Sequence, residues 1–110
     1  MEVRFYKTGS GKSLVKEFIL ALSDEARREI FDAVLLLEQG QVLAMPLSRN
    51  LASIHPALHE LRLKDRAGQI RVFYYLKKGD AIYFLHAFRK KTWELPEKEI
   101  RLVLKRLKEV

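Results

Sequence analysis

The chain contains no cysteine, and this absence excludes two classes of site. Without thiols there are neither disulfides nor thiolate metal ligands. The three histidines, His55, His59 and His86, do not have the spacing of zinc ligands. We therefore expect no metal site and no cofactor.

Long apolar runs are also absent. No segment approaches the ~20 apolar residues that a membrane-spanning helix needs. The opening residues, MEVRFYKTGS, are mixed and polar, unlike a secretory signal peptide. We expect a soluble protein of the cytoplasm, although a processed secreted protein without cysteine would look the same.

What the chain does have is apolar residues and positive charge. Its 110 residues are 48% hydrophobic, which suits one folded domain spanning residues 1–110. The formal net charge of +7 indicates a basic surface that attracts phosphate-rich polymers. An acidic protein or an anionic lipid would fit the same charge.

The first half of the chain reads as a short strand followed by two helices. VRFYK (3–7) alternates apolar and charged residues, as a strand does. Apolar residues at helical spacing over 14–22 predict a helix, and Ser23 has the character of an N-cap for a second helix that runs to Gly40. Segment 41–57 contains two prolines and reads mostly as loop.

The second half predicts three strands and a final helix. The strands are expected at 58–63, 70–76 and 81–88, joined by polar turns, and Leu95-Pro96 opens the helix. The order β-α-α-β-β-β-α is that of an α+β domain. We expect an N-terminal helical hairpin packed on a small antiparallel sheet, with a C-terminal helix.

Alternation along the strands sorts the side chains into two faces. If turn 64–69 closes a hairpin in which Arg62 stands opposite Arg71, an apolar face packs on the helices. The opposite face then carries charged and aromatic side chains. The apolar set is Leu61, Leu63, Ile70 and Val72, and the other set is Glu60, Arg62, Arg71, Phe73 and Tyr75.

A second hairpin that pairs Leu76 with Ala81 would add His86 opposite Arg71. Arg62, Arg71 and His86 would then form a row across three strands, with residues 89–91 just beyond the third strand. Like charges directly opposite one another are destabilising, so this arrangement is typical of a functional site. A slip of two residues would separate the arginines but keep them on one face.

Residues 58–100 resemble HigB-type toxins of the RelE/ParE superfamily. The motifs that carry the resemblance are Glu60-Leu61-Arg62, then Gly68 with Arg71-Val72-Phe73-Tyr74, then His86-Ala87-Phe88-Arg89-Lys90-Lys91-Thr92, and Pro96 at a helix start. The fold that this resemblance implies has two N-terminal helices on an antiparallel sheet with a basic concave face.

The resemblance also implies a function. Such proteins are toxins of type II toxin–antitoxin systems that cleave mRNA in the ribosomal A site, as metal-independent endoribonucleases (mRNA interferases). A cognate antitoxin, often a HigA-like helix-turn-helix protein, holds them inactive. Two alternatives remain open: a superfamily member without nuclease activity, which is ParE-like or only binds an antitoxin, and a plain RNA-binding module.

By their motif positions, the resemblance implies that four cations lie in the active site: Arg62, Arg71, Lys90 and Lys91. His86 matches the third motif. Cleavage by attack of the ribose 2′-hydroxyl needs neutralisation of the phosphorane charge, which arginine and lysine supply. Lys90 or Lys91 could act as the base, because neighbouring cations make a lysine lose its proton more readily. His86 is the second candidate for the base. Glu60 is the third, or else it balances the charge of Arg62.

Further residues are expected to bind RNA or to serve the structure. The candidates for RNA contact are Arg89, Lys64, Arg66, Phe73 and Tyr75. Trp93 is expected to cover the edge of the core rather than to stack on a base, and His59 to be structural. Flanks of the helices at 14–22 and 96–108 could be covered by an acidic antitoxin segment.

Overall fold

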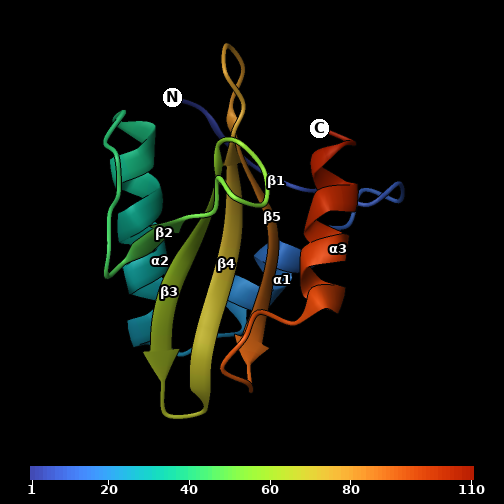
Figure 1. Cartoon of the computed structure of the whole chain (residues 1–110). Helices are drawn as coiled ribbons and strands as arrows, with labels where there is room; N and C mark the ends of the chain where they lie inside the picture. Colours follow the sequence, from blue (N-terminus) through green and yellow to red (C-terminus); the bar gives the residue numbers. More distant parts are fainter.

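The computed structural model describes residues 1–110 and confirms the α+β fold (Figure 1). One five-stranded sheet has the strand order β1-β5-β4-β3-β2. The strands are β1 (Val3–Phe5), β2 (Ser48–Asn50), β3 (Leu58–Asp65), β4 (Gly68–Leu76) and β5 (Ile82–Lys90), and the helices are α1 (Leu14–Leu20), α2 (Asp24–Glu38) and α3 (Glu97–Leu107).

Two features of the sheet differ from the prediction. Strand β1 pairs parallel with β5, so the sheet is mixed rather than antiparallel. Strand β2 lies in a segment that was predicted as loop, and it pairs antiparallel with β3. Its three residues, Ser48–Asn50, are all polar and show no apolar alternation, so only the partner strand reveals it.

The helical hairpin forms as its capping residues predict. The Ser23 side chain accepts a hydrogen bond from the Ala26 amide at the start of α2, and Ser13 caps α1 in the same way. Helix α2 ends at Glu38, before Gly40, whose φ of 83° suits glycine. Helix α1 ends at Leu20, two residues earlier than predicted, and Leu22 is still buried.

Both helices of the hairpin pack on one face of the sheet. The predicted apolar face is confirmed: its four residues join one buried cluster with side chains of α1 and α2, such as Ile19 and Ile30. In Figure 1, α1 lies behind the strands and α2 beside β3. Because the apolar side chains of each strand point to these helices, the alternate side chains point to the opposite face of the sheet.

Helix α3 covers part of the opposite face. Its Val103 and Leu107 pack in a second buried cluster with Phe73 of β4 and Leu85 of β5. Figure 1 shows α3 standing beside β5, away from β3. The face is therefore covered at one end and open near the β3–β4 turn. None of the three helices combines the length and the apolar character that a membrane span requires.

Candidate functional site

The two arginines of β3 and β4 face each other across the hairpin. Arg62 pairs with Arg71, as the sequence predicted, and the two-residue turn at 66–67 closes the strands. Side chains two residues apart in a strand share a face, so Glu60 and Lys64 lie on the same side as Arg62. Strand β2 extends this face, because Arg49 pairs with Glu60.

A β-bulge decides what β5 contributes. Phe73 pairs with His86, but the next residue, Tyr74, pairs with Phe84, so Leu85 is the extra residue. The prediction that His86 stands opposite Arg71 is therefore wrong. Leu76 pairs with Ile82 rather than with Ala81, and the bulge shifts the register by one further residue. Phe88 occupies that position.

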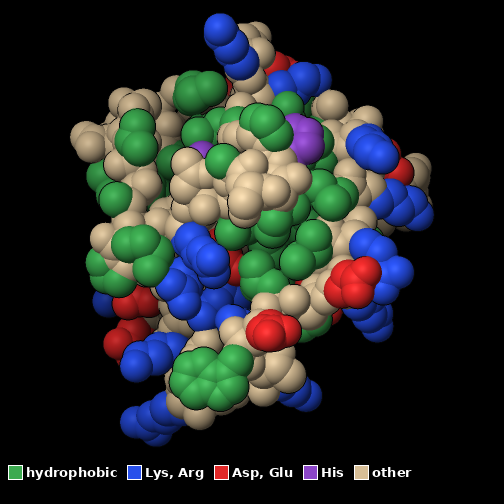
Figure 2. All heavy atoms as spheres, in the orientation of Figure 1, with side chains coloured by type: hydrophobic (Ala, Val, Ile, Leu, Met, Phe, Trp, Pro, Cys, Tyr) green, Lys and Arg blue, Asp and Glu red, His purple; other side chains and the backbone are tan.

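The bulge also brings Lys90 to the site. Lys90 pairs with Gln69, two residues from Arg71 in β4, and so shares the face of that arginine. Four cations, Arg49, Arg62, Arg71 and Lys90, thus gather around Glu60, and all four lower the pKa of its carboxyl through their charges. We call Arg49, Arg62, Arg71, Lys90 and Glu60 the cationic cluster. In Figure 2, Lys and Arg side chains gather over the lower part of the molecule, below a mainly hydrophobic area.

Glu60 is the buried centre of the cationic cluster. It is 1% exposed, and its carboxylate oxygens lie 3.8 Å from Nε of Arg62 and 3.9 Å from Nε of Arg71. Burial raises the pKa of Glu60, and the surrounding cations oppose that rise. One carboxylate cannot neutralise four cations, so the cluster keeps an excess of positive charge.

Arg71 is held by the strands around it. Its side chain donates to the carbonyl of Ile70 at 3.0 Å and to Oε1 of Gln69 at 2.6 Å, and the residue is 4% exposed. Burial lowers the pKa of Arg71 from its ordinary value. The guanidinium is thus fixed in position before any ligand arrives.

Hydrogen-bonding capacity in the cluster is left unused. The Nε atoms of Arg62 and Arg71 and one carboxylate oxygen of Glu60 are buried and make no hydrogen bond. Buried polar atoms in proteins are nearly always paired, so several unpaired atoms at one place indicate a binding site. The two donors among them face the carboxylate of Glu60 at 3.8 and 3.9 Å, too far for a hydrogen bond, so charge alone holds them.

Lys90 has an altered proton affinity. Burial lowers the pKa of its ammonium group, and the positive charge of Arg71 lowers it further. The side chain therefore loses its proton at a lower pH than an ordinary lysine does. This makes Lys90 the cation of the cluster best suited to proton transfer.

Two pockets of about 320 Å³ each flank the cluster and share Arg62 and Gln69. The first is lined also by Lys90, Lys91 and Trp93. The second includes Arg71 and Lys64. Lys91, which follows the last residue of β5, thus lies beside the cluster, as does Lys64 at the end of the hairpin.

Arg89 does not join its neighbours Lys90 and Lys91. It pairs with Ile70, on the helix-facing side of the sheet, and its guanidinium donates two hydrogen bonds to Asp65 at 2.6 and 2.9 Å. Alternation along β5 is the reason, because adjacent residues point to opposite faces. Arg66, in the β3–β4 turn, lines a pocket with Arg89 and the start of α2.

The aromatic residues predicted to contact RNA are packed inside. Phe73 is 1% exposed and stacks with Phe88 at a ring-centroid distance of 5.9 Å. It offers no surface to a base, because α3 covers this end of the face. Tyr75 is half-buried and packs edge-on against His55 at 5.7 Å.

His86 belongs to the junction with α3 rather than to the cationic cluster. Its ring stacks nearly parallel to Phe73 and Phe88, and its Nε2 bonds to the carboxylate of Glu99 in α3. Burial lowers the pKa of His86, and Glu99 opposes that shift. His59, as expected, lies on the helix-facing side, stacked on Tyr74.

Sequence reasoning missed two residues near the site. Arg49 lies in β2, and the only signal for it was a charged residue in a presumed loop. Trp93 was expected to cover the core, but it is 95% exposed beside Lys90 and Lys91. That expectation was wrong because residues 91–96 form a connection that leaves the surface of the sheet.

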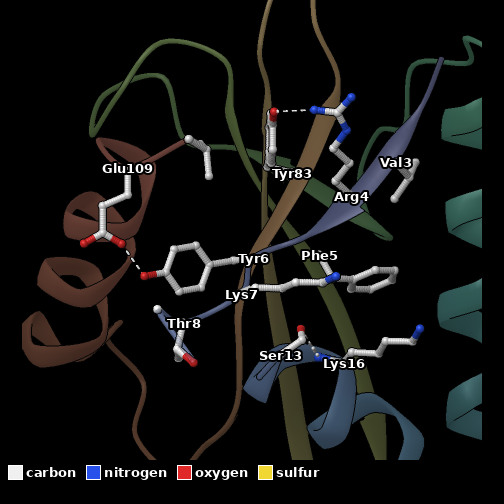
Figure 3. Close-up of a pocket in the computed structure, with 12 residues that line it drawn as sticks. Val3, Arg4, Phe5, Tyr6, Lys7, Thr8, Ser13, Lys16, Tyr83 and Glu109 are labelled. Atoms are coloured by element: carbon white, nitrogen blue, oxygen red, sulfur yellow. Dashed lines mark hydrogen bonds between the residues drawn. The ribbon is translucent and has the colours of Figure 1, made fainter. Parts of the chain in front are cut away.

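A larger cavity, of about 720 Å³, lies at the edge of β1 and has a different character (Figure 3). There Arg4 donates to the hydroxyl of Tyr83 at 3.1 Å, and the Tyr6 hydroxyl donates to Glu109. Its polar side chains are largely paired with one another, so it lacks the unused donors of the cationic cluster. No three His, Cys, Asp or Glu side chains in the molecule could together hold a metal ion.

Comparison with known families adds one finding. A family model described as "Phage derived protein Gp49-like (DUF891)" matches residues 17–108, from within α1 to just past α3. The match includes all five residues of the cationic cluster. No curated protein matches the chain.

Proposed function

Since the chain belongs to the Gp49-like family of phage-derived proteins, within the RelE/HigB-like toxin group, we propose that it is the toxin of a type II toxin–antitoxin system. We further propose that it is a ribosome-dependent endoribonuclease that cleaves mRNA at the cationic cluster. The observation that carries the proposal is the excess of positive charge around Glu60, together with the guanidinium and ammonium donors of Arg62, Lys90 and Lys91 that line one pocket. A phosphodiester meets both needs, because it offers negative charge and several acceptors.

The reaction proposed is attack of a ribose 2′-hydroxyl on the adjacent phosphate. Neutral Lys90 accepts the hydroxyl proton, the bond from O2′ to phosphorus forms, and the bond from phosphorus to the 5′-oxygen breaks. Protonated Lys91, which lines the same pocket, donates a proton to the departing oxygen. The products are a 2′,3′-cyclic phosphate and a 5′-hydroxyl.

The arginines stabilise the charge that develops. The phosphorane is more anionic than the substrate, so fixed cations bind it more strongly than the ground state. Arg62, whose side chain is 31% exposed, contacts the phosphate directly, and Arg71 acts from a position fixed by its backbone and Gln69 contacts. Glu60 offsets part of the repulsion among the cations.

The experiment compares two arginine substitutions that remove the same charge from opposite faces of the sheet. Arg62→Ala is expected to lower cleavage by about 10²–10³-fold, the effect of deleting one donor to a developing oxyanion. Arg89→Ala, which removes an arginine bonded to Asp65, is expected to keep the activity. Growth arrest and mapped mRNA 5′ ends in cells expressing each variant provide the readout.

The proposal predicts codon-phased cuts in translated messages for the wild type and Arg89→Ala, and their loss in Arg62→Ala. Circular dichroism checks that each variant is folded. Growth arrest by Arg62→Ala with intact messages would contradict it and favour a toxin that acts through protein contact. Copurification with the product of an adjacent helix-turn-helix gene tests the antitoxin partner.

A further inference from the structure

Trp93 is the most exposed large side chain of the molecule that lies next to the cationic cluster. The residue is 95% exposed, whereas tryptophan is on average highly buried. It makes no aromatic or cation–π contact within the chain, so both faces of its indole are free. The cost of exposing so much apolar surface indicates that the ring contacts a ligand or partner.

The surroundings of Trp93 indicate which chemistry that ligand has. The indole lines one pocket with Arg62, Lys90 and Lys91, and no carboxylate lines that pocket. A ligand that fills the pocket must therefore carry negative charge at one end and an apolar, planar surface at the other. A nucleotide has this combination, because its phosphate is anionic and its base has a π-face.

The connection that carries Trp93 contains a hydrogen bond of its own. Residues 91–96 link β5 to α3, and the Thr92 hydroxyl donates to the carbonyl of Glu94 at 2.8 Å, closing a turn around Trp93. This turn sets the indole just beyond the end of β5, two residues after Lys91. Two of the cations that line the pocket, Lys90 and Lys91, thus come from the same continuous segment as the ring.

We propose that Trp93 stacks on an unpaired base of the RNA whose backbone is bound by Arg62, Lys90 and Lys91. This inference rests on the proposed function and adds a contact that orients the substrate in the pocket. Trp93 is then a positioning residue, which acts on binding and alignment rather than on proton transfer. An acidic protein segment is the competing occupant, because its carboxylates would match the same cations.

The chain contains a single tryptophan, so its fluorescence reports on this position alone. The probe is a short single-stranded RNA with 2′-O-methyl riboses, which cannot be cleaved. Its matched control has the same backbone with abasic sites. The complete oligonucleotide is expected to quench the indole emission by stacking, and the abasic one to bind more weakly without quenching.

Substitutions separate stacking from charge. Trp93→Ala is expected to weaken binding of the complete oligonucleotide roughly 5- to 150-fold, the range for loss of one stacked base. Trp93→Phe is expected to restore most of the affinity, because a smaller ring still stacks. Phe31→Ala, which removes an exposed ring from α2, is the control and should leave the affinity unchanged.

Several results would overturn the inference without affecting the proposed function. These are equal quenching by complete and abasic oligonucleotides, equal affinity of Trp93→Ala and the wild type, or no binding of the oligonucleotide at all. Quenching by polyglutamate as strong as that by RNA would assign the indole to an acidic protein partner. The proposed function fails separately, if Arg62→Ala keeps its pattern of mRNA cuts.

Discussion

One face of the sheet has two ends with opposite properties. At the end covered by α3, Phe73, Phe88 and His86 stack in parallel, and His86 is bonded to Glu99. At the open end, Arg62 and Arg71 stand opposite each other around a single carboxylate, with donors unpaired. The packed rings of the first end stabilise the fold, whereas the crowded cations of the second end destabilise it. Such local destabilisation is typical of binding sites.

The difference comes from what lies over each end. The same two strands, β4 and β5, supply residues to both ends, and beyond the bulge their side chains alternate without interruption from His86 to Lys90. Helix α3 brings apolar side chains such as Val103 to one end only. On the uncovered end the Arg62 side chain stays 31% exposed and Lys90 stays half-buried, and both line one pocket, close enough to act on one ligand.

The largest expected effect on stability is at the covered end. Phe73→Ala should lower the free energy of unfolding by about 3–5 kcal/mol, because it leaves a cavity under α3. Arg62→Ala at the open end, the matched change, should alter it by less than about 1 kcal/mol. Urea unfolding followed by circular dichroism measures both. Equal losses would show that the two ends do not differ as described.

Glu60→Ala tests the charge balance at the open end. The substitution leaves Arg71, only 4% exposed, without its nearby carboxylate. We expect a loss of about 3 kcal/mol, since an uncompensated buried charge is costly. A double-mutant cycle with Arg71→Ala should reveal a coupling between the two residues. Independent, additive effects would mean that Glu60 does not balance Arg71.

A smaller effect is expected from the titration of His86. Burial lowers its pKa in the folded state below the ordinary value of about 6.5. The unfolded chain then binds more protons in this range, so the free energy of unfolding falls as the pH drops through about 6.5. Glu99 and Arg106 are the charged groups that face the ring.

His86→Gln removes this titration and keeps a donor for Glu99. The variant should lose less stability than the wild type between pH 7.5 and pH 5.5, measured by urea unfolding at each pH. His59, whose pKa burial also lowers, acts in the same direction and remains in both proteins. An identical decline in the two proteins would exclude His86 as a contributor.

The smallest effect is expected at Trp93. Because the side chain is 95% exposed, Trp93→Ala should change the free energy of unfolding by no more than about 0.5 kcal/mol. The same unfolding measurement checks it. A loss of several kcal/mol would mean that the indole serves the fold, and would remove the reason to expect a ligand there.

Much of the fold was predictable because the signals were local. Ser23 marks the start of α2, and the turn after Asp65 sets Arg62 against Arg71. Strand β2 escaped prediction because its residues, Ser48–Asn50, are all polar and show no apolar alternation, and Arg49 was missed with it. Phe73 and Trp93 were both misjudged, since exposure depends on which element lies above a residue.

The sequence by itself determined the helical hairpin, the three long strands and the pairing of Arg62 with Arg71, because helical and strand periods and a short turn are properties of neighbouring residues. Only the tertiary structure decided the rest. Because of the bulge at Leu85, Lys90 lies on the same face of the sheet as the arginines. Helix α3 covers His86 and Phe73 but not Glu60. Both outcomes depend on packing between segments that are distant in the chain, and a local sequence pattern does not show which of these long-range contacts form.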